Sequence, residues 1–452
     1  MSSEPTRELP LIARHAGTIF TGQVAVLAFG LTDTMVVARH SSESLAGLSV
    51  GAATYISIFV GLLGVMQAQL PIWAHLRGAG RHAEVGASVR QAVYLALLTS
   101  AVGMAALLSP GLLLEATQVP QELRSSVQGY LAIRALALPP ALFFRLYSTL
   151  NQSLGKPLLV TWVQVGALAV KVPLTLWFVF GGAGVPAMGL EGCAWATLVV
   201  NYGMVVLAVA MLRGSAIYKP YRIWQRLERP DWAQQRAFAR LGVPTGLAIM
   251  VEVTSFTLMA LFIARQGTVA AAGHQVAASL AGLMYMVPLS LGIAASARVS
   301  YWLGAGDLPR AQRALQLGLG LAVGLASGAG VLVVLLHGPI ARLLAGDNPQ
   351  VVAMASALLL WVAVYHLADA TQAVCVFILR SFGIATTALV VYCVLLWGGG
   401  LGGGYLLAYR GVFGIGPLHT PAAFWGAGAA ALLLTAAVFM TLLWQAARQR
   451  RA

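Results

Sequence analysis

Residues 244–264 read PTGLAIMVEVTSFTLMALFIA, an apolar run that contains a single charged side chain, Glu252. About 20 such residues are enough to cross the hydrocarbon core of a bilayer as an α-helix. Similar runs recur along the whole chain, and they do not alternate polar and apolar residues as membrane β-strands do. The predicted fold class is therefore an all-α polytopic membrane protein.

The composition agrees with this fold class. Hydrophobic residues make up 59% of the chain and charged residues only 9%, whereas a soluble domain carries roughly 25% charged residues. We predict twelve transmembrane helices, at residues 13–38, 46–73, 87–114, 126–147, 158–180, 190–212, 239–264, 272–298, 313–338, 351–379, 386–408 and 422–445. Because an even number of spans returns the chain to its starting face, both termini are expected on one side of the membrane.

The net charge of +14 is distributed unevenly over the predicted loops. The face that carries the termini holds 21 of the 28 Lys and Arg residues, and the opposite face holds five. Cytoplasmic loops of membrane proteins show such an excess of positive charge. Both termini are therefore expected in the cytoplasm. The basic charge is assigned to topology, and no nucleic-acid partner is predicted.

A polar stretch at residues 213–240 divides the chain into two sets of six spans. We predict an N-terminal six-helix lobe at 1–212, a cytoplasmic linker at 213–238 and a C-terminal six-helix lobe at 239–452. A break of this length after six spans is typical of a chain built from two halves.

The two halves are similar in sequence. LRGAGR at 76–81 resembles LGAGD at 303–307, and VPQEL at 119–123 resembles NPQVV at 348–352. Six spans return the chain to its starting face, so the halves are predicted to be parallel, pseudo-twofold-related bundles. Transporters built from repeats hold their substrate and ion sites near the membrane midplane and alternate access by rocking the halves.

Three carboxylates lie deep inside apolar runs: Asp33, Glu252 and Asp369. A charge at bilayer depth costs at least about 2.5–3.5 kcal/mol, so it is usually retained for a function. Two carboxylates that lie close together in a low dielectric hold a proton or a metal ion between them. We predict that these residues bind cations or protons. The alternative is that they only hydrogen-bond neighbouring helices together.

Six segments spread over the whole chain carry a family resemblance. They read GQVAVLAFGLTDTMVVA (22–38), LPIWAHLRGAGR (70–81), VEVTSF (251–256), AAGHQVA (271–277), ARVSYWLGAGD (297–307) and YHLADATQAV (365–374). As a set they resemble the multidrug and toxic compound extrusion (MATE) family, in its NorM-like branch. The resemblance implies a twelve-helix antiporter of the bacterial cytoplasmic (inner) membrane. Such a protein exports cationic amphipathic drugs and toxic organic compounds against Na⁺ or H⁺, as a monomer and without a cofactor.

The resemblance assigns roles to four residues. Glu252 and Asp369 correspond to the cation-binding carboxylates of the second half, and they are Na⁺ ligands if transport is coupled to sodium. Tyr365, one helical turn before Asp369, corresponds to an accessory contact. Asp33 corresponds to the acidic residue of the first-half cavity. Whether Na⁺, H⁺ or both drive transport stays open.

Lys171 departs from the family pattern, which usually has asparagine at its position and at that of Thr175. An intramembrane lysine needs a partner, and the family fold places the first and fifth helices around one cavity. We hypothesise an Asp33–Lys171 ion pair that removes this half as a metal-cation site. The alternative is that Lys171 extends along a water-filled cavity. Arg134, in the fourth span, either lines a vestibule or reaches the interface.

Three further residues are candidates for the site, each with a structural alternative. His366 either relays protons near neutral pH or packs and hydrogen-bonds. Gln275 either lines a cavity or joins two helices. Phe256, like Tyr365, can stack on a planar cation, although most such aromatic residues serve packing.

Two other functions compete with drug export. An exporter or flippase of lipid-linked or other metabolites, from the same transporter superfamily, needs a strongly cationic cavity. Here the three deep acids outnumber Lys171 and Arg134. A membrane-embedded enzyme or receptor needs a catalytic constellation or a signalling domain, and the sequence contains no HExxH or GxSxG motif with partners. The chain is therefore not expected to be an enzyme, and its expected partners are small organic cations and the lipid bilayer.

Overall fold

The computed structural model describes residues 8–111, 121–412, 414 and 416–449, apart from the side chain of Glu122. Twelve helices in this part of the chain are long and apolar enough to cross a membrane, which confirms the predicted number. Most begin and end a few residues beyond the predicted spans, because the polar residues that flank each apolar run continue the helix. The predicted end of the third span, residues 112–114, and residues 119–120 of the VPQEL segment lie outside the described residues.

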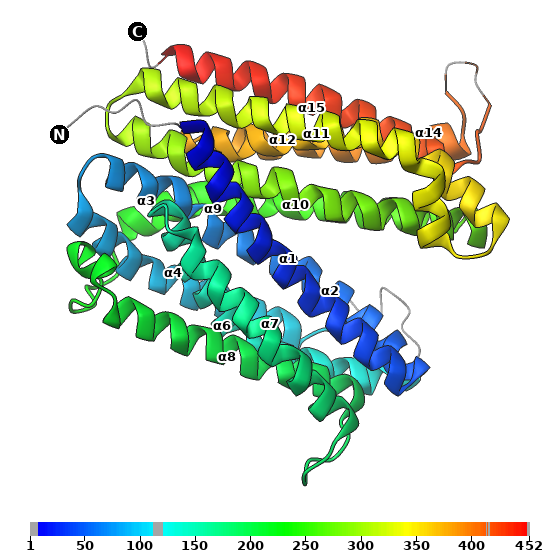
Figure 1. Ribbon diagram of the computed structural model, residues 1–452, viewed down its shortest axis with the longest axis horizontal. Helices are drawn as coiled ribbons and strands as arrows, with labels where there is room; N and C mark the ends of the chain where they lie inside the picture. The colour runs from blue at the N-terminus through cyan, green and yellow to red at the C-terminus, as the bar shows by residue number, and fades with distance from the viewer. Residues whose placement is uncertain (1–7, 112–120, 413, 415, 450–452) are drawn as a thin grey trace. The chain divides into compact units, whose positions relative to one another are not determined.

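The structure is almost entirely helical (Figure 1). The first half contains α1 (Glu8–His40), α2 (Ser42–Gln67), α3 (Gln69–Gly78), α4 (His82–Leu108), α6 (Gln121–Ser153), α7 (Pro157–Phe180), α8 (Gly189–Gly214) and the short 3₁₀ helix η1 (Ala216–Tyr221). The second half contains α9 (Trp232–Ala264), α10 (Thr268–Gly304), α11 (Leu308–Ala345), α12 (Pro349–Ser381), α13 (Thr386–Tyr392), the π-helical segment η2 (Cys393–Gly402), α14 (Gly403–Tyr409) and α15 (Pro421–Gln449).

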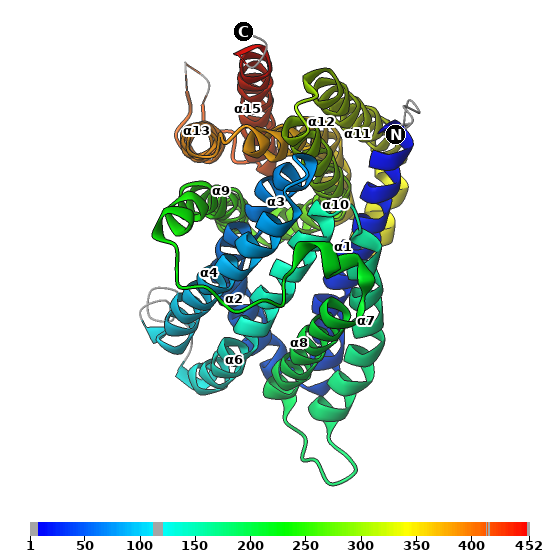
Figure 2. The ribbon, with the colours of Figure 1, turned by 90° about the vertical axis from the view of Figure 1, so that its left-hand side faces the viewer.

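The chain forms two compact units, and each is built around one central helix. The described residues between 21 and 246 form the first unit, in which α6 packs against α2, α4 and α8 (Figure 2). The described residues up to 20 and from 247 onward form the second unit, in which α12 packs against α10, α11 and α15 (Figure 1). In both units the fourth span packs against the second, third and sixth spans of its half. This shared packing pattern supports the duplication predicted from the sequence.

The matched Gly-Ala-Gly loops have the same backbone geometry. Gly80 and Gly306 both have φ = 73°, a left-handed conformation that favours glycine. The nitrogen of Arg81 donates to the carbonyl of Leu76, and that of Asp307 donates to the carbonyl of Trp302, both at 3.0 Å. This hydrogen bond closes a helix on a left-handed glycine. The second span of each half therefore ends in the same way.

The linker packs along α4 within the first unit. Arg90 of α4 donates to both carboxylate oxygens of Glu228, and its Nη1 lies 2.7 Å from the carbonyl oxygen of Arg222. At Gly86 an added methyl group would lie 1.7 Å from the carbonyl oxygen of Tyr221, so only glycine allows this approach. The linker is thus a docked segment of the first unit.

The compact units differ from the predicted lobes of residues 1–212 and 239–452 at two places. The linker and the start of α9 belong to the first unit, because the linker is bonded to α4. Residues up to Phe20 belong to the second unit. There Glu8 accepts hydrogen bonds from Arg298, at 2.6 and 3.0 Å, and from Trp302, at 3.0 Å.

Candidate cation site

Glu252 of α9 and Asp369 of α12 are joined by one side chain, Gln372. The amide nitrogen of Gln372 lies 3.2 Å from Oε1 of Glu252 and 2.9 Å from Oδ1 of Asp369. Gln372 follows Asp369 by three residues, so the two share a helix face. The two predicted carboxylates are therefore linked through one amide group, which donates a hydrogen bond to each of them.

The remaining end of Gln372 is held as well. Its amide oxygen accepts a hydrogen bond from the hydroxyl of Tyr392, at the end of α13. Gln372 is fully buried, and Tyr392 is 1% exposed. A buried amide that donates at one end and accepts at the other is fixed in position, because any rotation leaves a buried polar group unpaired. The bridge between the carboxylates is therefore rigid in this arrangement.

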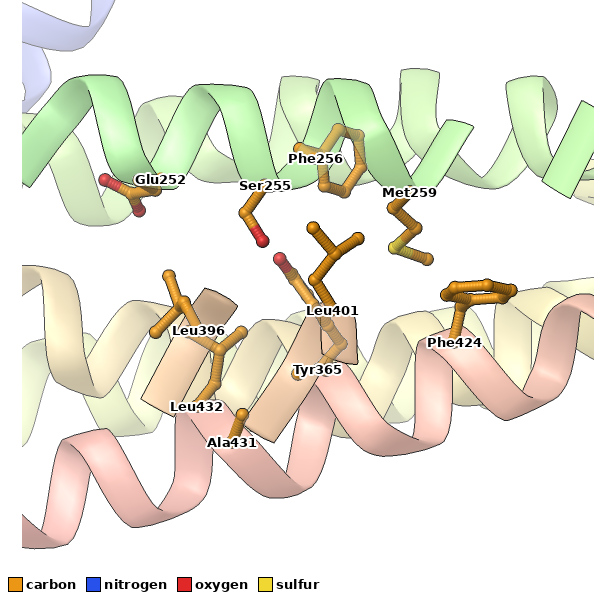
Figure 3. Close-up of a pocket in the computed structure, with 12 residues that line it drawn as sticks. Glu252, Ser255, Phe256, Met259, Tyr365, Leu396, Leu401, Phe424, Ala431 and Leu432 are labelled. Atoms are coloured by element: carbon orange, nitrogen blue, oxygen red, sulfur yellow. The ribbon is translucent and has the colours of Figure 1, made fainter. Parts of the chain in front are cut away.

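A small pocket adjoins Glu252 (Figure 3). Glu252 lies at one end of the pocket and Phe424 at the other, with Phe256, Met259 and Tyr365 between them. Asp369 is 7% exposed and is not among the residues that line the pocket. Glu252 is therefore the carboxylate that a molecule in the pocket meets first.

The π-helical segment η2 forms one wall of this pocket, through Leu396, Gly400 and Leu401. The indole nitrogen of Trp397 donates to the carbonyl of Val251 at 3.1 Å, one residue before Glu252. An added methyl group at Gly400 would lie 3.3 Å from the Ala431 side chain, so this segment approaches α15 closely. The π-helical segment thus lies next to Glu252. Such distortions in helices are frequently found at functional sites.

Three aromatic residues line the pocket, Phe256, Tyr365 and Phe424, and Trp425 packs against the first two. Phe256 lies 6.4 Å from Tyr365 and 5.9 Å from Trp425, and Tyr365 lies 5.2 Å from Trp425, measured between ring centroids. The faces of such rings attract a desolvated organic cation. The two predicted aromatic candidates, Phe256 and Tyr365, are therefore both on the pocket wall, close to the charge of Glu252.

In the first unit Asp33 forms the ion pair that was hypothesised with Lys171. Lys171 Nζ lies 2.6 Å from Oδ1 of Asp33 and 2.6 Å from Oγ1 of Thr197. Its side chain is fully buried. Lys171 therefore does not extend into open water, and the charge of Asp33 is balanced within the protein.

The other two candidates lie outside this arrangement. His366 is buried on α12, three residues before Asp369, and no hydrogen bond among the described residues joins it to either carboxylate. Gln275 is exposed on α10, and its amide nitrogen lies 3.5 Å from the hydroxyl oxygen of Ser279 on the same helix. Neither side chain is part of the Glu252–Asp369 bridge.

Sequence reasoning missed Gln372 and Tyr392. Gln372 carries a signal that could have found it, because it is a polar residue in an apolar run at the i+3 position from Asp369. Tyr392 carries no such signal, since a tyrosine in an apolar span is usually a packing residue. Among the described residues, no group of three or more His, Cys, Asp or Glu side chains has the arrangement of a metal site.

Comparison with known proteins gives one consistent family. The MatE family profile matches residues 19–177 and 244–406. A protein of Aromatoleum aromaticum described as "Probable multidrug resistance protein NorM" is 35% identical over 429 residues, which cover 95% of this chain and 92% of the relative. The "Multidrug resistance protein MdtK" of Pectobacterium atrosepticum is 32% identical and covers 90% of this chain and 89% of its own.

Solved structures show the same fold. The eukaryotic MATE transporter AtDTX14 superposes with a TM-score of 0.86 at 18% identity, over 98% of each chain. The Vibrio cholerae MATE transporter VcmN, in its bent form, also gives a TM-score of 0.86, at 15% identity, and covers 98% of this chain and 97% of its own.

The class of protein is a polytopic membrane transporter. Its features are twelve apolar helices, a duplicated packing pattern and a pair of bridged carboxylates beside an aromatic pocket. The chain belongs to the MatE family, and its NorM-named relatives place it in the NorM-like branch.

Proposed function

We propose that this protein exports cationic amphipathic drugs and toxic organic compounds in exchange for Na⁺ or H⁺. The observation that carries the proposal is the position of Glu252, which is bonded through Gln372 to Asp369 and also lines the pocket. One carboxylate thus belongs both to a pair of buried acids and to the wall of an aromatic-lined pocket.

Competition for this charge couples the two movements. Two carboxylates in a low dielectric do not both stay ionised unless a cation balances them. A bound Na⁺ or proton supplies that balance, and so does an organic cation held against Glu252 and the aromatic rings. Since either occupant removes the charge that attracts the other, entry of the driving ion favours release of the substrate.

Each residue then has a defined part in the exchange. Glu252 and Asp369 bind the coupling ion, and Glu252 also meets the substrate. Gln372 holds the two carboxylates together, while Phe256 and Tyr365 contact the flat part of the substrate. Oxygen ligands suit Na⁺ as they suit other hard cations, and carboxylates serve protons equally well. The proposal includes no cofactor besides the transported ion.

The remaining expectations belong to the same proposal. The excess of Lys and Arg in the loops on one face supports a cytoplasmic position for both termini, in the cytoplasmic (inner) membrane. A monomeric working unit is part of the same proposal, since the carboxylates, the amide between them and the pocket all lie within one chain.

The test is efflux of ethidium from vesicles that contain the purified protein, with Na⁺ and pH gradients imposed separately. Wild-type protein is expected to move ethidium against at least one gradient. Glu252→Gln and Asp369→Asn are each expected to lower the gradient-driven rate about tenfold or more, because each removes a charge that binds the coupling ion. A tenfold change in rate corresponds to about 1.4 kcal/mol.

Glu84→Gln is the matched control, since Glu84 is an exposed carboxylate paired with Arg81 on a loop-proximal turn. It is expected to keep the wild-type rate. Wild-type efflux in both Glu252→Gln and Asp369→Asn would remove the carboxylate pair from the mechanism. No efflux under either gradient would contradict the proposed antiport itself.

A further inference from the structure

Arg134 of α6 is an intramembrane cation that forms no direct ion pair with the described residues. None of the ion pairs among the described residues includes it. It lies 13 residues after the first residue of α6, which is about 20 Å along the helix at 1.5 Å per residue. At that depth a lipid headgroup is out of reach, and an unpaired charge is costly.

The guanidinium group is held on an aromatic platform. Its central carbon lies 3.7 Å from the ring centroid of Tyr55 and 5.9 Å from that of Tyr130. Both rings are 3% exposed. An added methyl group at Gly51 would lie 2.6 Å from the Tyr130 ring, so this glycine makes room for the platform. Cation–π contact on a buried face stabilises the arginine and fixes the orientation of its plane.

The donors of this arginine are unused. Its Nε is buried without a hydrogen-bond partner, and its terminal nitrogens form no hydrogen bond or ion pair with the described residues. The residue as a whole is partly exposed. A buried donor without a partner costs about 1–3 kcal/mol, and more when it is charged. The platform thus presents a fixed, unsatisfied fork of donors.

The nearby carboxylates are already engaged or out of reach. Asp33 is paired with Lys171 at 2.6 Å. Glu191, at the start of α8, lies against Gly129, where an added methyl group would be 2.1 Å from its Oε1, and it forms no ion pair with Arg134 among the described residues. Asp33, Lys171 and Arg134 together therefore carry one net positive charge, which is the opposite of a cation site.

We propose that Arg134 is a specificity-determining residue that binds the carboxylate of a substrate carrying both a cationic and a carboxylate group. The planar guanidinium fork matches the two oxygens of a carboxylate, and such a ligand supplies the missing negative charge and the missing acceptors. Transport of such a substrate rests on the proposed export function. Binding of its carboxylate to Arg134 does not depend on that function.

The experiment measures equilibrium binding to the purified protein in detergent. The probes are norfloxacin, which carries an amine and a carboxylate, its methyl ester, which lacks the carboxylate charge, and ethidium. Wild-type protein is expected to bind the acid at least about tenfold more tightly than the ester, as expected for a hydrogen bond to a charged group. This comparison needs no variant, so it holds even if a substitution fails to fold.

Variants then assign the preference to Arg134. Arg134→Gln is expected to lower the affinity for norfloxacin about tenfold or more, to the level of the ester, and to leave ethidium and ester binding within about twofold. Arg134→Lys keeps the charge but loses the fork, and is expected to fall between the two. Arg145→Gln is the matched control, because Arg145 lies on the same helix and its Nε also lacks a partner.

Three results would overturn the proposal: equal wild-type affinity for acid and ester, an equal loss for all three probes in Arg134→Gln, or the same selective loss in Arg145→Gln. Vesicle efflux separates this inference from the proposed function. Selective binding without gradient-driven efflux contradicts antiport alone, whereas efflux with no preference for the acid contradicts the role of Arg134 alone.

Discussion

At the scale of single residues, the molecule treats its buried acids in two ways. Asp33 is neutralised by a lysine of the same unit, whereas Glu252 and Asp369 share only the neutral amide of Gln372. The first arrangement consumes the charge within the protein. The second leaves negative charge beside a pocket, where a mobile cation can balance it. Similar carboxylates in similar spans therefore lie in different electrostatic surroundings.

The Asp33–Lys171 pair predicts a strong dependence of each side chain on the other. Lys171→Met is expected to destabilise the protein by about 3–5 kcal/mol, because it leaves a buried carboxylate without its partner. Adding Asp33→Asn to that variant is expected to restore much of the loss. Thermal unfolding of the two single variants and the double variant measures the coupling. Additive losses would mean that the pair contributes nothing specific.

The Gln372 bridge makes a second prediction at this scale. Gln372→Leu removes the donor shared by two carboxylates and the acceptor of Tyr392. A loss of about 2 kcal/mol or more is expected, since hydrogen bonds to charged groups contribute about 1.5–3 kcal/mol. Gln67→Leu is the control, because Gln67 is also buried but its amide nitrogen has no partner. Equal unfolding temperatures for the two variants would contradict the bridging role.

At the scale of elements, side chains of α4 hold the linker in place by hydrogen bonds. Besides Arg90 and Glu228, Gln91 donates to the carbonyl of Arg229 and accepts from the nitrogen of Asp231, both at 2.9 Å. The hydroxyl of Tyr94 donates to the carbonyl of Glu228 at 2.8 Å. These contacts replace water for several backbone groups of the linker, so a polar segment is held in one conformation without a core of its own.

The hydrogen bond from Arg90 holds the pKa of Glu228 below its ordinary value of 4.5. The docked state therefore favours the charged form, and its stabilisation is present at neutral pH and lost as the pH falls through that lowered pKa. Hydrogen exchange of residues 216–231, corrected for the intrinsic rate, is expected to lose protection below about pH 4.5. Glu228→Gln should show weak protection at every pH. A wild-type profile that does not change with pH would refute the role of this pair.

At the scale of the whole molecule, the duplicated halves carry unequal sites. Both central helices, α6 and α12, have matching neighbours, and the Gly80 and Gly306 turns are alike. The buried charges differ, because one half holds the Asp33–Lys171 ion pair and an arginine without an ion pair among the described residues, whereas the other holds the bridged carboxylates. Duplication thus preserves the packing of the helices but not the charge that they enclose.

This inequality predicts the ion stoichiometry. Purified protein is expected to bind at most one Na⁺ per chain, because Lys171 already occupies the charge of Asp33. Titration with radioactive Na⁺ measures the number of sites. Any binding observed is expected to disappear in Glu252→Gln and to persist in Glu84→Gln. Two sites per chain would show that the first half also binds metal cations.

The sequence by itself determined the membrane class, the twelve spans, the repeat and the presence of three acids deep in apolar runs, Asp33, Glu252 and Asp369. Apolar length and the high cost of a charge in lipid are local properties, so they can be read one segment at a time. The pairing of Asp33 with Lys171 was also within reach, because a buried lysine needs a buried acid.

Only the tertiary structure decided which side chains complete each site. Gln372 joins two carboxylates that lie 117 positions apart along the chain, Tyr392 holds that amide, and Arg134 lies on tyrosines of two helices. It also placed the linker on α4 and the first turns of α1 with the second unit. Contacts of this kind depend on how helices pack in three dimensions, and the order of residues along one helix does not contain that information.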